Sequence, residues 1–298
     1  MKKDNQSCLT EMVLLGFSDF RTIQELLFCL VLIFYFIALM GNSLVLILTV
    51  INSTLHTPMY FFLWNLSFVE ISSTSSISPK MLVNALSDNQ NISFWGCRCQ
   101  MCFFILFSTT ECCLLCVMAY DRYVSICKPL QYPYTMNLRE CTMLVAASWT
   151  IGVFVGLGQS ISIFTLPFCG SDRISHFFCD LMPVLRLVST NTYKNEVAIA
   201  ALTVLFILVP LLLILFSYIL IISSIFTMPL AKNQNKAFST CSSHLAVVCI
   251  FYGTGIVTYI RPIVTPSLNP IIYSLRNKEI KAAFMKSVTR NNHGVRKL

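Results

Sequence analysis

The chain has 298 residues, of which 56% are hydrophobic and only 11% charged, and its net charge is +8. A typical soluble domain is about one-quarter charged. This composition therefore excludes an ordinary soluble enzyme and a disordered chain. The apolar residues occur in long blocks, and a helix needs about 20 such residues to cross a bilayer. The sequence predicts an all-α membrane protein.

The apolar blocks predict six clear membrane spans and a doubtful seventh. The first block begins after Glu25 and continues to Ile51. It is too long for the apolar region of a cleavable signal peptide, which is about 7–15 residues, so we expect it to be retained. The blocks cover residues 26–51, 59–82, 100–124, 141–166, 197–225 and 239–260, and the doubtful stretch covers 263–275.

The seventh stretch is short for a span. It runs from Ile263 to Leu275 and contains Pro266 and Pro270. Its length corresponds to about 20 Å of helix, whereas the hydrocarbon layer is about 30 Å thick. We therefore expect a seven-transmembrane helix bundle with a shortened seventh helix, the missing length lying between Ile260 and Pro266.

The charge distribution predicts the orientation in the membrane. With the N-terminus outside, the inner segments hold twelve Lys and Arg residues against three acids, and the outer segments hold eight of each. Because cytoplasmic loops carry the excess of Lys and Arg, we expect a multi-pass protein of the cell membrane with an extracellular N-terminus and no nucleic-acid partner. The expected parts are an extracellular tail (1–25), a transmembrane bundle (26–275) and a cytoplasmic tail (276–298) with an amphipathic helix on the membrane surface.

Apart from Asp121 and Arg122 near the end of the third span, three charged residues lie within the predicted spans, namely Glu70, Lys80 and Glu111. Two ionised carboxylates would repel each other strongly at low dielectric. Either one of the two acids is protonated or a cation lies between them. A cation site is one interpretation, and neutral acids bonded to the backbone or to Asn42 are the other.

Several spaced motifs resemble those of olfactory receptors, which are rhodopsin-like (class A) G protein-coupled receptors. They follow the order of that family and cover nearly the whole chain. The central motif extends from Met118 to Leu130 and contains Asp121-Arg122-Tyr123. The others are Gly41-Asn42, Leu55-His56-Thr57-Pro58-Met59-Tyr60, Ser217-Tyr218, the stretch from Lys236 to His244, and Asn269-Pro270-Ile271-Ile272-Tyr273.

The resemblance implies a receptor rather than an enzyme. Such a receptor binds a small volatile odorant and activates a heterotrimeric G protein of the stimulatory olfactory type, which raises cAMP. The Asp121–Arg122 pair would hold the inactive state, and opening of the bundle would release Arg122 to meet the G protein. A solvated ion pair at a helix end is the alternative. The implied switch residues are Asp121, Arg122, Tyr123, Tyr218, Asn269 and Tyr273.

The resemblance also implies binding sites within the bundle. Glu70 and Glu111, together with Asn269, would bind a sodium ion. The odorant cavity would be mostly apolar with a few hydroxyl groups, and ordinary interhelical packing is the alternative reading of its residues. The residues expected to line the cavity are Phe104, Ile105, Ser108, Thr109, Phe206, Tyr252 and Tyr259.

Two covalent modifications are expected on the outer side. The resemblance implies a disulfide between Cys97 and Cys179. Ser189 stands where the family has the partner of Cys169, so we expect Cys169 to be a free thiol or to pair with another cysteine. Of the three Asn-x-Ser/Thr sequences, Asn5 is the expected glycosylation site. Asn91 lies too close to the membrane for efficient transfer of a glycan.

Three other functions compete with a working odorant receptor. One is a receptor remnant whose signalling is impaired by the short seventh helix. Another is a cation or proton transporter that uses Glu70 and Glu111, against which the absence of an internal repeat argues. An intramembrane hydrolase is the third, but the two acids lack the sequence context that such enzymes use.

Overall fold

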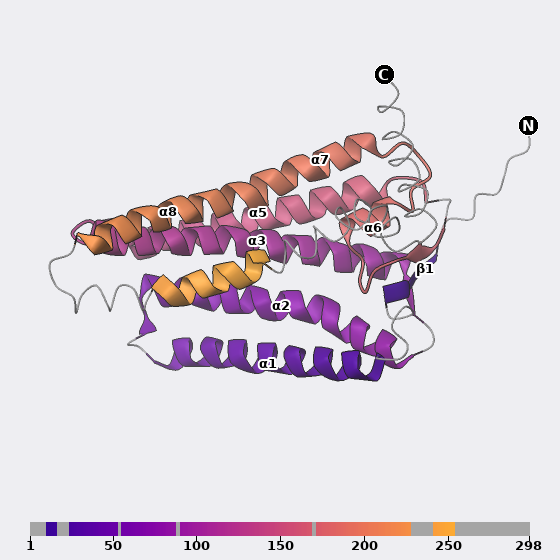
Figure 1. The fold of residues 1–298 in the computed structure, drawn as a ribbon, viewed down its shortest axis with the longest axis horizontal. Helices are drawn as coiled ribbons and strands as arrows, with labels where there is room; N and C mark the ends of the chain where they lie inside the picture. The colour runs from indigo at the N-terminus through magenta and orange to yellow at the C-terminus, as the bar shows by residue number, and fades with distance from the viewer. Residues whose placement is uncertain are drawn as a thin grey trace, which may run out of the picture. The chain divides into compact units, whose positions relative to one another are not determined.

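The computed structural model describes residues 10–16, 24–52, 55–87, 90–168, 171–227 and 241–253. The chain divides into two units, Met1–Ala237 and Phe238–Leu298. The first unit contains a bundle of long helices (Figure 1). In the second unit, the described residues form an apolar helix, Cys241–Gly253.

The first unit is built from helices that follow the predicted spans. The long ones are α1 (Gln24–Ile51), α2 (Pro58–Leu86), α3 (Phe94–Cys127) and α5 (Leu138–Phe164). A further continuous helix consists of α7 (Tyr193–Thr203), the π-helical segment η3 (Val204–Leu208) and α8 (Val209–Phe226). Two short helices, α4 (Tyr132–Thr135) and α6 (Leu181–Leu185), lie in the connections.

Four helices among the described residues are long and apolar enough to cross a membrane: α1, α3, α5 and the continuous helix Tyr193–Phe226. Helix α2 has the length but not the apolarity, because it carries Glu70, Lys80 and a serine-rich stretch. The expectation of a multi-pass helical membrane protein is confirmed. The seventh stretch and the tail helix lie outside the described residues.

Local sequence signals explain where several helices begin. The Ser93 hydroxyl accepts a hydrogen bond from the Gly96 N–H at the start of α3 (3.1 Å), and the Asn137 side chain accepts from the Glu140 N–H at the start of α5 (3.0 Å). Helix α2 begins with Pro58, whose missing N–H costs nothing in the first turn. These caps satisfy N–H groups that a helix cannot satisfy itself.

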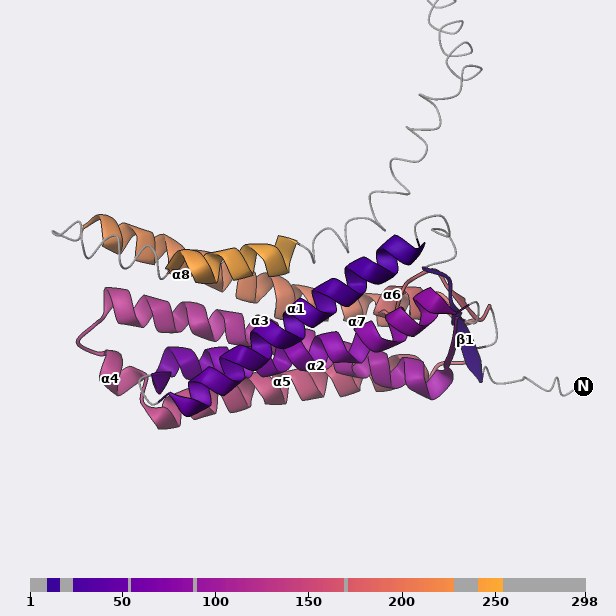
Figure 2. The same ribbon diagram turned by 90° about the horizontal axis from the view of Figure 1, so that it is seen from below.

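Polar contacts and small residues hold the long helices together. Helices α1 and α2 run antiparallel and are joined by hydrogen bonds at three levels. These bonds link Gln24 to the Ala85 carbonyl, Tyr35 to Ser75, and Asn42 to Glu70. Helix α5 approaches α3 through Gly152 and Gly156, where backbone atoms of α3 occupy the space that a side chain would need. Figure 2 shows α1 crossing the bundle obliquely. Close approach at small residues and interhelical hydrogen bonds are the usual basis of packing in membranes.

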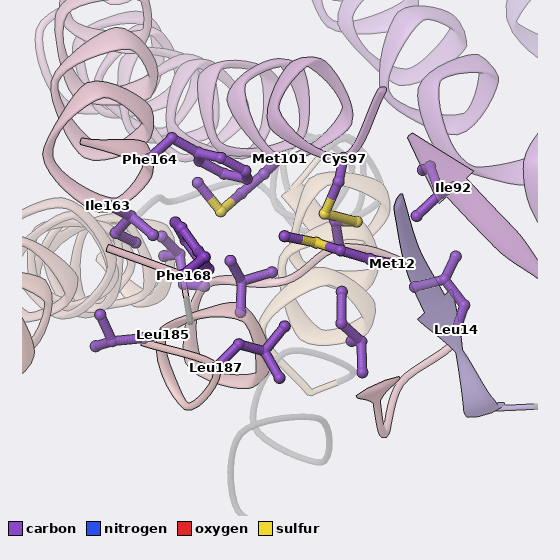
Figure 3. Packing of buried hydrophobic residues seen from close by; sticks show 14 of the residues in the cluster. Met12, Leu14, Ile92, Cys97, Met101, Ile163, Phe164, Phe168, Leu185 and Leu187 are labelled. Carbon is purple, nitrogen blue, oxygen red and sulfur yellow. A yellow bond between two sulfur atoms is a disulfide. The ribbon is translucent and has the colours of Figure 1, made fainter. Parts of the chain in front are cut away.

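A small sheet closes one end of the bundle. Strand β1 (Glu11–Leu14) pairs antiparallel with β2 (Asn91–Ser93), with Met12 opposite Ile92, and parallel with β3 (Arg173–Ile174). The Met12 and Leu14 side chains are fully buried in a hydrophobic cluster with residues of α3 and α5 (Figure 3). We call this end the disulfide end, because Cys97 and Cys179 belong to the same cluster.

Candidate ligand-binding and signalling sites

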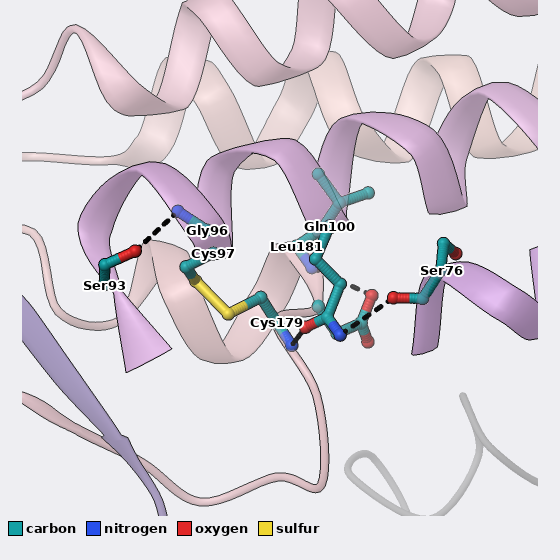
Figure 4. Close-up of a disulfide and its surroundings, with 8 residues drawn as sticks. Ser76, Ser93, Gly96, Cys97, Gln100, Cys179 and Leu181 are labelled. Atoms are coloured by element: carbon teal, nitrogen blue, oxygen red, sulfur yellow. Dashed lines mark hydrogen bonds between the residues drawn. A yellow bond between two sulfur atoms is a disulfide. The ribbon is translucent and has the colours of Figure 1, made fainter. Parts of the chain in front are cut away.

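A disulfide fixes the loop after α5 to the start of α3. Cys97 is bonded to Cys179, with their Cα atoms 5.4 Å apart, as the resemblance implied. Beside it, the Gln100 side chain accepts a hydrogen bond from the Cys179 N–H (3.0 Å) and donates to the Ser76 carbonyl of α2 (3.2 Å) (Figure 4). The loop, α3 and α2 are therefore held in one network. The prediction for Cys169 lies outside the described residues.

The loop also covers part of the expected odorant site. The Phe178 ring, next to the disulfide, contacts the Phe104 ring of α3 with the ring centres 5.0 Å apart. The His176 ring also contacts the Phe178 ring, with the ring centres 4.6 Å apart. The half-buried Phe104 thus lies beneath the rings of His176 and Phe178 at the disulfide end, and we call these two rings the aromatic lid.

The other residues expected to line that site are only partly brought together. Ile105 packs into the buried hydrophobic cluster with residues of α5, which is the packing role that the alternative interpretation gave it. Thr109 is buried, Ser108 is half-buried, and Phe206 lies half-buried in η3, a segment that contacts α3. Tyr252 belongs to the second unit, and Tyr259 lies outside the described residues.

The loop carries a buried acid close to the disulfide. Asp180 is 7% exposed, and its carboxylate accepts a hydrogen bond from the Leu181 N–H (2.8 Å) at the start of α6. Burial raises the pKa of the Asp180 carboxyl, while the Leu181 N–H and the nearby His176 act in the opposite direction.

Near the middle of the bundle, Glu70 has a defined partner. The Asn42 amide of α1 donates to the Glu70 carboxylate at 2.8 Å. Glu111 of α3 is close enough to interact electrostatically with Glu70. The hydrogen bond to Asn42 was expected under the neutral-acid interpretation, and two carboxylates with an amide oxygen are also suitable ligands for a hard cation. Asn269 lies outside the described residues.

At the opposite end of α3, Asp121 bonds to a tyrosine rather than to the neighbouring arginine. The Tyr132 hydroxyl of α4 donates to the Asp121 carboxylate at 2.9 Å, and Asp121 is 2% exposed. In the described part of the chain, no carboxylate lies within ion-pair distance of Arg122. Arg122 is still close enough to interact electrostatically with Asp121, and the Tyr132 hydrogen bond adds a contact between α3 and the following loop. Successive residues of a helix point in different directions, which places the two side chains apart.

Burial and the adjacent Asp121 carboxylate raise the pKa of the Tyr132 hydroxyl, so the hydroxyl remains a proton donor at neutral pH. The remaining switch residues are placed as follows: Arg122 and Tyr123 are half-buried on α3, and Tyr218 is buried on α8. Asn269 and Tyr273 lie outside the described residues.

The sequence did not reveal three residues of these sites: Tyr132, Phe178 and Gln100. No spacing rule connects Tyr132 with Asp121, because a turn separates α3 from α4. Phe178 carried a usable signal, since it precedes the predicted disulfide cysteine and must lie near α3 once that bond forms. Gln100 lies one turn after Cys97, on the same side of α3, and carried the same signal.

Comparison with known proteins gives the family. Residues 41–285 match the 7 transmembrane receptor (rhodopsin family). The chain is 48% identical over 293 residues to the human protein named Olfactory receptor 10AG1, covering 93% of this chain and 97% of that protein. It is 49% identical over 308 residues to human Olfactory receptor 10A4, covering 97% of this chain and 98% of that protein. The chain therefore belongs to the rhodopsin family of seven-transmembrane receptors, within its olfactory receptor group.

Proposed function

We propose that the receptor binds a small volatile odorant and activates a heterotrimeric G protein of the stimulatory olfactory type, which raises cAMP. The observation that carries this proposal is the similarity to human olfactory receptors over 93–97% of the chain. The same similarity favours a receptor over a cation transporter or a hydrolase. The N-terminus is extracellular in this proposal, which puts the Cys97–Cys179 bond on the oxidising side of the membrane.

The odorant site lies under the aromatic lid in this proposal. Phe104, Ser108 and Thr109 follow one another on α3, and Phe178 closes over the first of them. Phe206 comes from η3, a π-helical segment, and such segments occur frequently at functional sites. Aromatic walls with a few hydroxyl groups suit a small molecule that is mostly apolar.

A cAMP assay with a panel of volatile compounds tests the activity and the site. We expect Phe104→Leu and Phe206→Leu to shift the half-maximal odorant concentration by about tenfold or more, because each removes aromatic contact area from the ligand. Phe154→Leu is the matched control, since Phe154 is on α5 and 73% exposed. Equal shifts in all three variants would show that the cavity is elsewhere. A receptor present at the surface that answers no odorant would contradict the activity itself.

The G protein would meet the end of the bundle that carries Asp121. Leu130 and Tyr134, in the connection between α3 and α5, are 89% and 84% exposed. Large apolar side chains exposed at a loop are suited to contact a protein partner. The Tyr132–Asp121 hydrogen bond fixes this loop to α3, so a movement of α3 would move the exposed side chains.

A signalling-impaired receptor is the alternative that we propose to test, on the ground of the short interval for the seventh helix. The alignment with Olfactory receptor 10A4 covers 308 positions but this chain has 298 residues, so some residues of that protein have no counterpart here. We propose that the missing residues shorten the seventh helix. Exposed backbone at its upper end would require thinning of the bilayer or entry of water. An epitope tag at the C-terminus, probed with and without permeabilisation, tests whether the helix still crosses. Normal trafficking with a robust odorant-evoked cAMP rise would refute the impairment.

A sodium ion between Glu70 and Glu111 is a further part of the proposal. The support is the proximity of the two carboxyl groups and the Asn42 amide. Bound sodium would offset the repulsion between the acids. We expect sodium chloride to raise the thermal stability of the purified receptor more than N-methylglucamine chloride does, and Glu111→Gln to abolish the difference. An unchanged difference in Glu111→Gln would end the sodium hypothesis.

Glycosylation at Asn5 also remains a proposal. Asn5 lies outside the described residues, but the rival Asn91 is on β2 and donates its side-chain amide to Glu11 of β1 at 2.9 Å. We expect Asn5→Gln to remove the shift in electrophoretic mobility that a glycosidase produces, and Asn91→Gln to leave it. The reverse result would assign the glycan to Asn91.

A further inference from the structure

A cavity apart from the proposed odorant site lies between α2 and α3 at the disulfide end. Its volume is about 460 Å³, within the range of small-molecule sites. Ser76 and Lys80 line it from α2, and Ser93, Gly96, Cys99 and Phe103 line it from the start of α3 (Figure 4 shows Ser76, Ser93 and Gly96). Phe104, Ser108 and Phe206 do not contribute to its wall.

The cavity wall carries a lysine without a counterion. In the part of the chain that the structure describes, no carboxylate lies within ion-pair distance of the Lys80 ammonium group. Glu11 of β1 accepts a hydrogen bond from the side-chain amide of Asn91, which also lines the cavity. A cation on a membrane helix is costly unless it is paired, and intramembrane charges mark functional sites. An anion in the cavity would supply the missing pair.

The start of α3 adds to the positive potential of this cavity. Ser93 is the N-cap of α3, and both Ser93 and Gly96 line the wall, so the positive end of the helix dipole lies at the cavity. Gln100 also lines the cavity, and its side-chain oxygen and nitrogen are both used in hydrogen bonds, to the Cys179 N–H and to the Ser76 carbonyl. It fixes the wall and leaves the charge of Lys80 for a ligand.

A buried amide lies one turn beyond Lys80. Ser76, Lys80 and Asn84 are spaced four residues apart and share one face of α2. Asn84 is 0% exposed, and neither its oxygen nor its nitrogen has a hydrogen-bond partner within the described structure. Buried polar groups normally have hydrogen-bond partners, so the Asn84 amide could bond to a polar ligand at this end of the face.

The other side of the cavity is apolar and open. Phe103 is 49% exposed and stacks on Phe107 along the outside of α3, with the ring centres 6.0 Å apart. An alkyl chain can follow this aromatic strip, while its head remains near Lys80. We propose that the cavity binds an amphiphile with one anionic headgroup, a phosphate or a carboxylate, held by Lys80 and the start of α3.

The Cys99 thiol lines the cavity and is exposed, which makes it a local reporter of occupancy. The receptor would be purified in nanodiscs of phosphatidylcholine and treated with a maleimide, and the extent of modification at Cys99 read by mass spectrometry. Cys29 on α1, also exposed, is the internal control for folding and reagent. Dodecyl phosphate is the anionic probe, and dodecyltrimethylammonium and dodecanol are the cationic and neutral probes.

We expect dodecyl phosphate to slow the modification of Cys99 about fivefold or more, and the other two probes to slow it much less, as for a partly solvated charge pair. Lys80→Met should abolish this protection and Lys80→Arg should retain it. Lys194→Met, at the exposed start of α7, is the matched control and should behave as the wild type. Cys29 should react equally throughout.

Two outcomes of this experiment would contradict the proposal. Equal protection by the anionic and cationic probes in the wild-type receptor would overturn it, even if Lys80→Met failed to fold. Retained protection in a folded Lys80→Met receptor would show that Lys80 merely extends to the membrane surface. The source of the anion is settled by nanodiscs containing phosphatidylglycerol. Protection without dodecyl phosphate would identify a membrane phospholipid, and protection only after its addition would identify a free amphiphile.

Discussion

The contact between α3 and α5 yields the sharpest prediction for stability. A methyl group added at Gly152 would lie 2.7 Å from the Leu106 carbonyl oxygen of α3 and closer still to the Thr110 hydroxyl. These two groups are themselves joined, since the Thr110 hydroxyl donates to the Leu106 carbonyl at 2.8 Å. Neither can turn away freely. The substitution Gly152→Ala therefore requires the two helices to separate.

The cost can be worked from these distances. Ordinary contact begins at 3.4 Å, so clearing the Leu106 carbonyl oxygen alone requires a displacement of about 0.7 Å, and the Thr110 hydroxyl must also move. A gap of that size forfeits a quarter to a half of the dispersion energy of the atoms that lose contact. Overpacking typically costs about 1–3 kcal/mol, and alanine recovers up to about 1 kcal/mol of helix propensity. We expect a net loss of roughly 1–2 kcal/mol.

The assay is the fraction of purified receptor that remains monodisperse on size exclusion after heating, combined with surface expression. Gly158→Ala is the matched control, because Gly158 is on the same helix and nothing lies within 4 Å of an added methyl group. It should be neutral or slightly stabilising. If the two variants melted alike, the close approach of α5 to α3 at Gly152 would be wrong.

Three further results are expected. Tyr132→Phe removes the hydrogen bond to Asp121 and should lower the thermal stability of the receptor and change basal cAMP. Because the raised pKa of Tyr132 keeps its hydroxyl protonated below pH 10, the stability of the wild-type contact should not vary between pH 6 and 9. A loss of the contact within that pH range would contradict this reasoning. Asp180→Asn should be at least as stable as the wild type at pH 7. A raised carboxyl pKa means that the folded state favours the protonated acid, so the contribution of Asp180 to the free energy of unfolding falls as pH rises above about 4. A destabilised Asp180→Asn variant would refute the cost of burying this carboxylate. Gly16→Ala should reduce surface expression, since the added methyl group would meet the Phe177 backbone nitrogen at 2.7 Å, and normal expression would show that β1 is dispensable.

The sequence predicted the spans well because a bilayer imposes a simple length rule. Each long helix overlaps a predicted apolar block, and the differences are at the ends. Helix α3 begins at Phe94 instead of residue 100, because the Ser93 cap and the disulfide extend it beyond the apolar block. Polarity is the weaker guide. Helix α2 is 29 residues long despite its charged and serine residues.

The sites were predicted less completely, because their partners come from loops. The pairing of Cys97 with Cys179 followed from the family resemblance and is confirmed. The β1 strand was not predicted, since three or four residues of extended chain carry too weak a pattern, and only their burial against the loop stabilises them. The hydrogen bond of Asp121 to Tyr132 was not predicted, because only the fold brings the two residues together.

Helix α3 connects the two proposed sites, and its contacts indicate where a signal can pass. At the disulfide end it is fixed to the loop by a covalent bond, and along its length it is pressed against the glycines of α5. Near the opposite end it contacts α8, where the Cys127 thiol donates a hydrogen bond to the Leu220 carbonyl at 3.8 Å. A switch needs an element with two arrangements, and tightly packed backbones resist small displacements. We expect relative movement of α3 and α8 rather than of α3 and α5, because α8 has no glycine that brings its backbone against α3. The π-helical segment η3, which carries Phe206 of the proposed odorant site, joins α7 to α8.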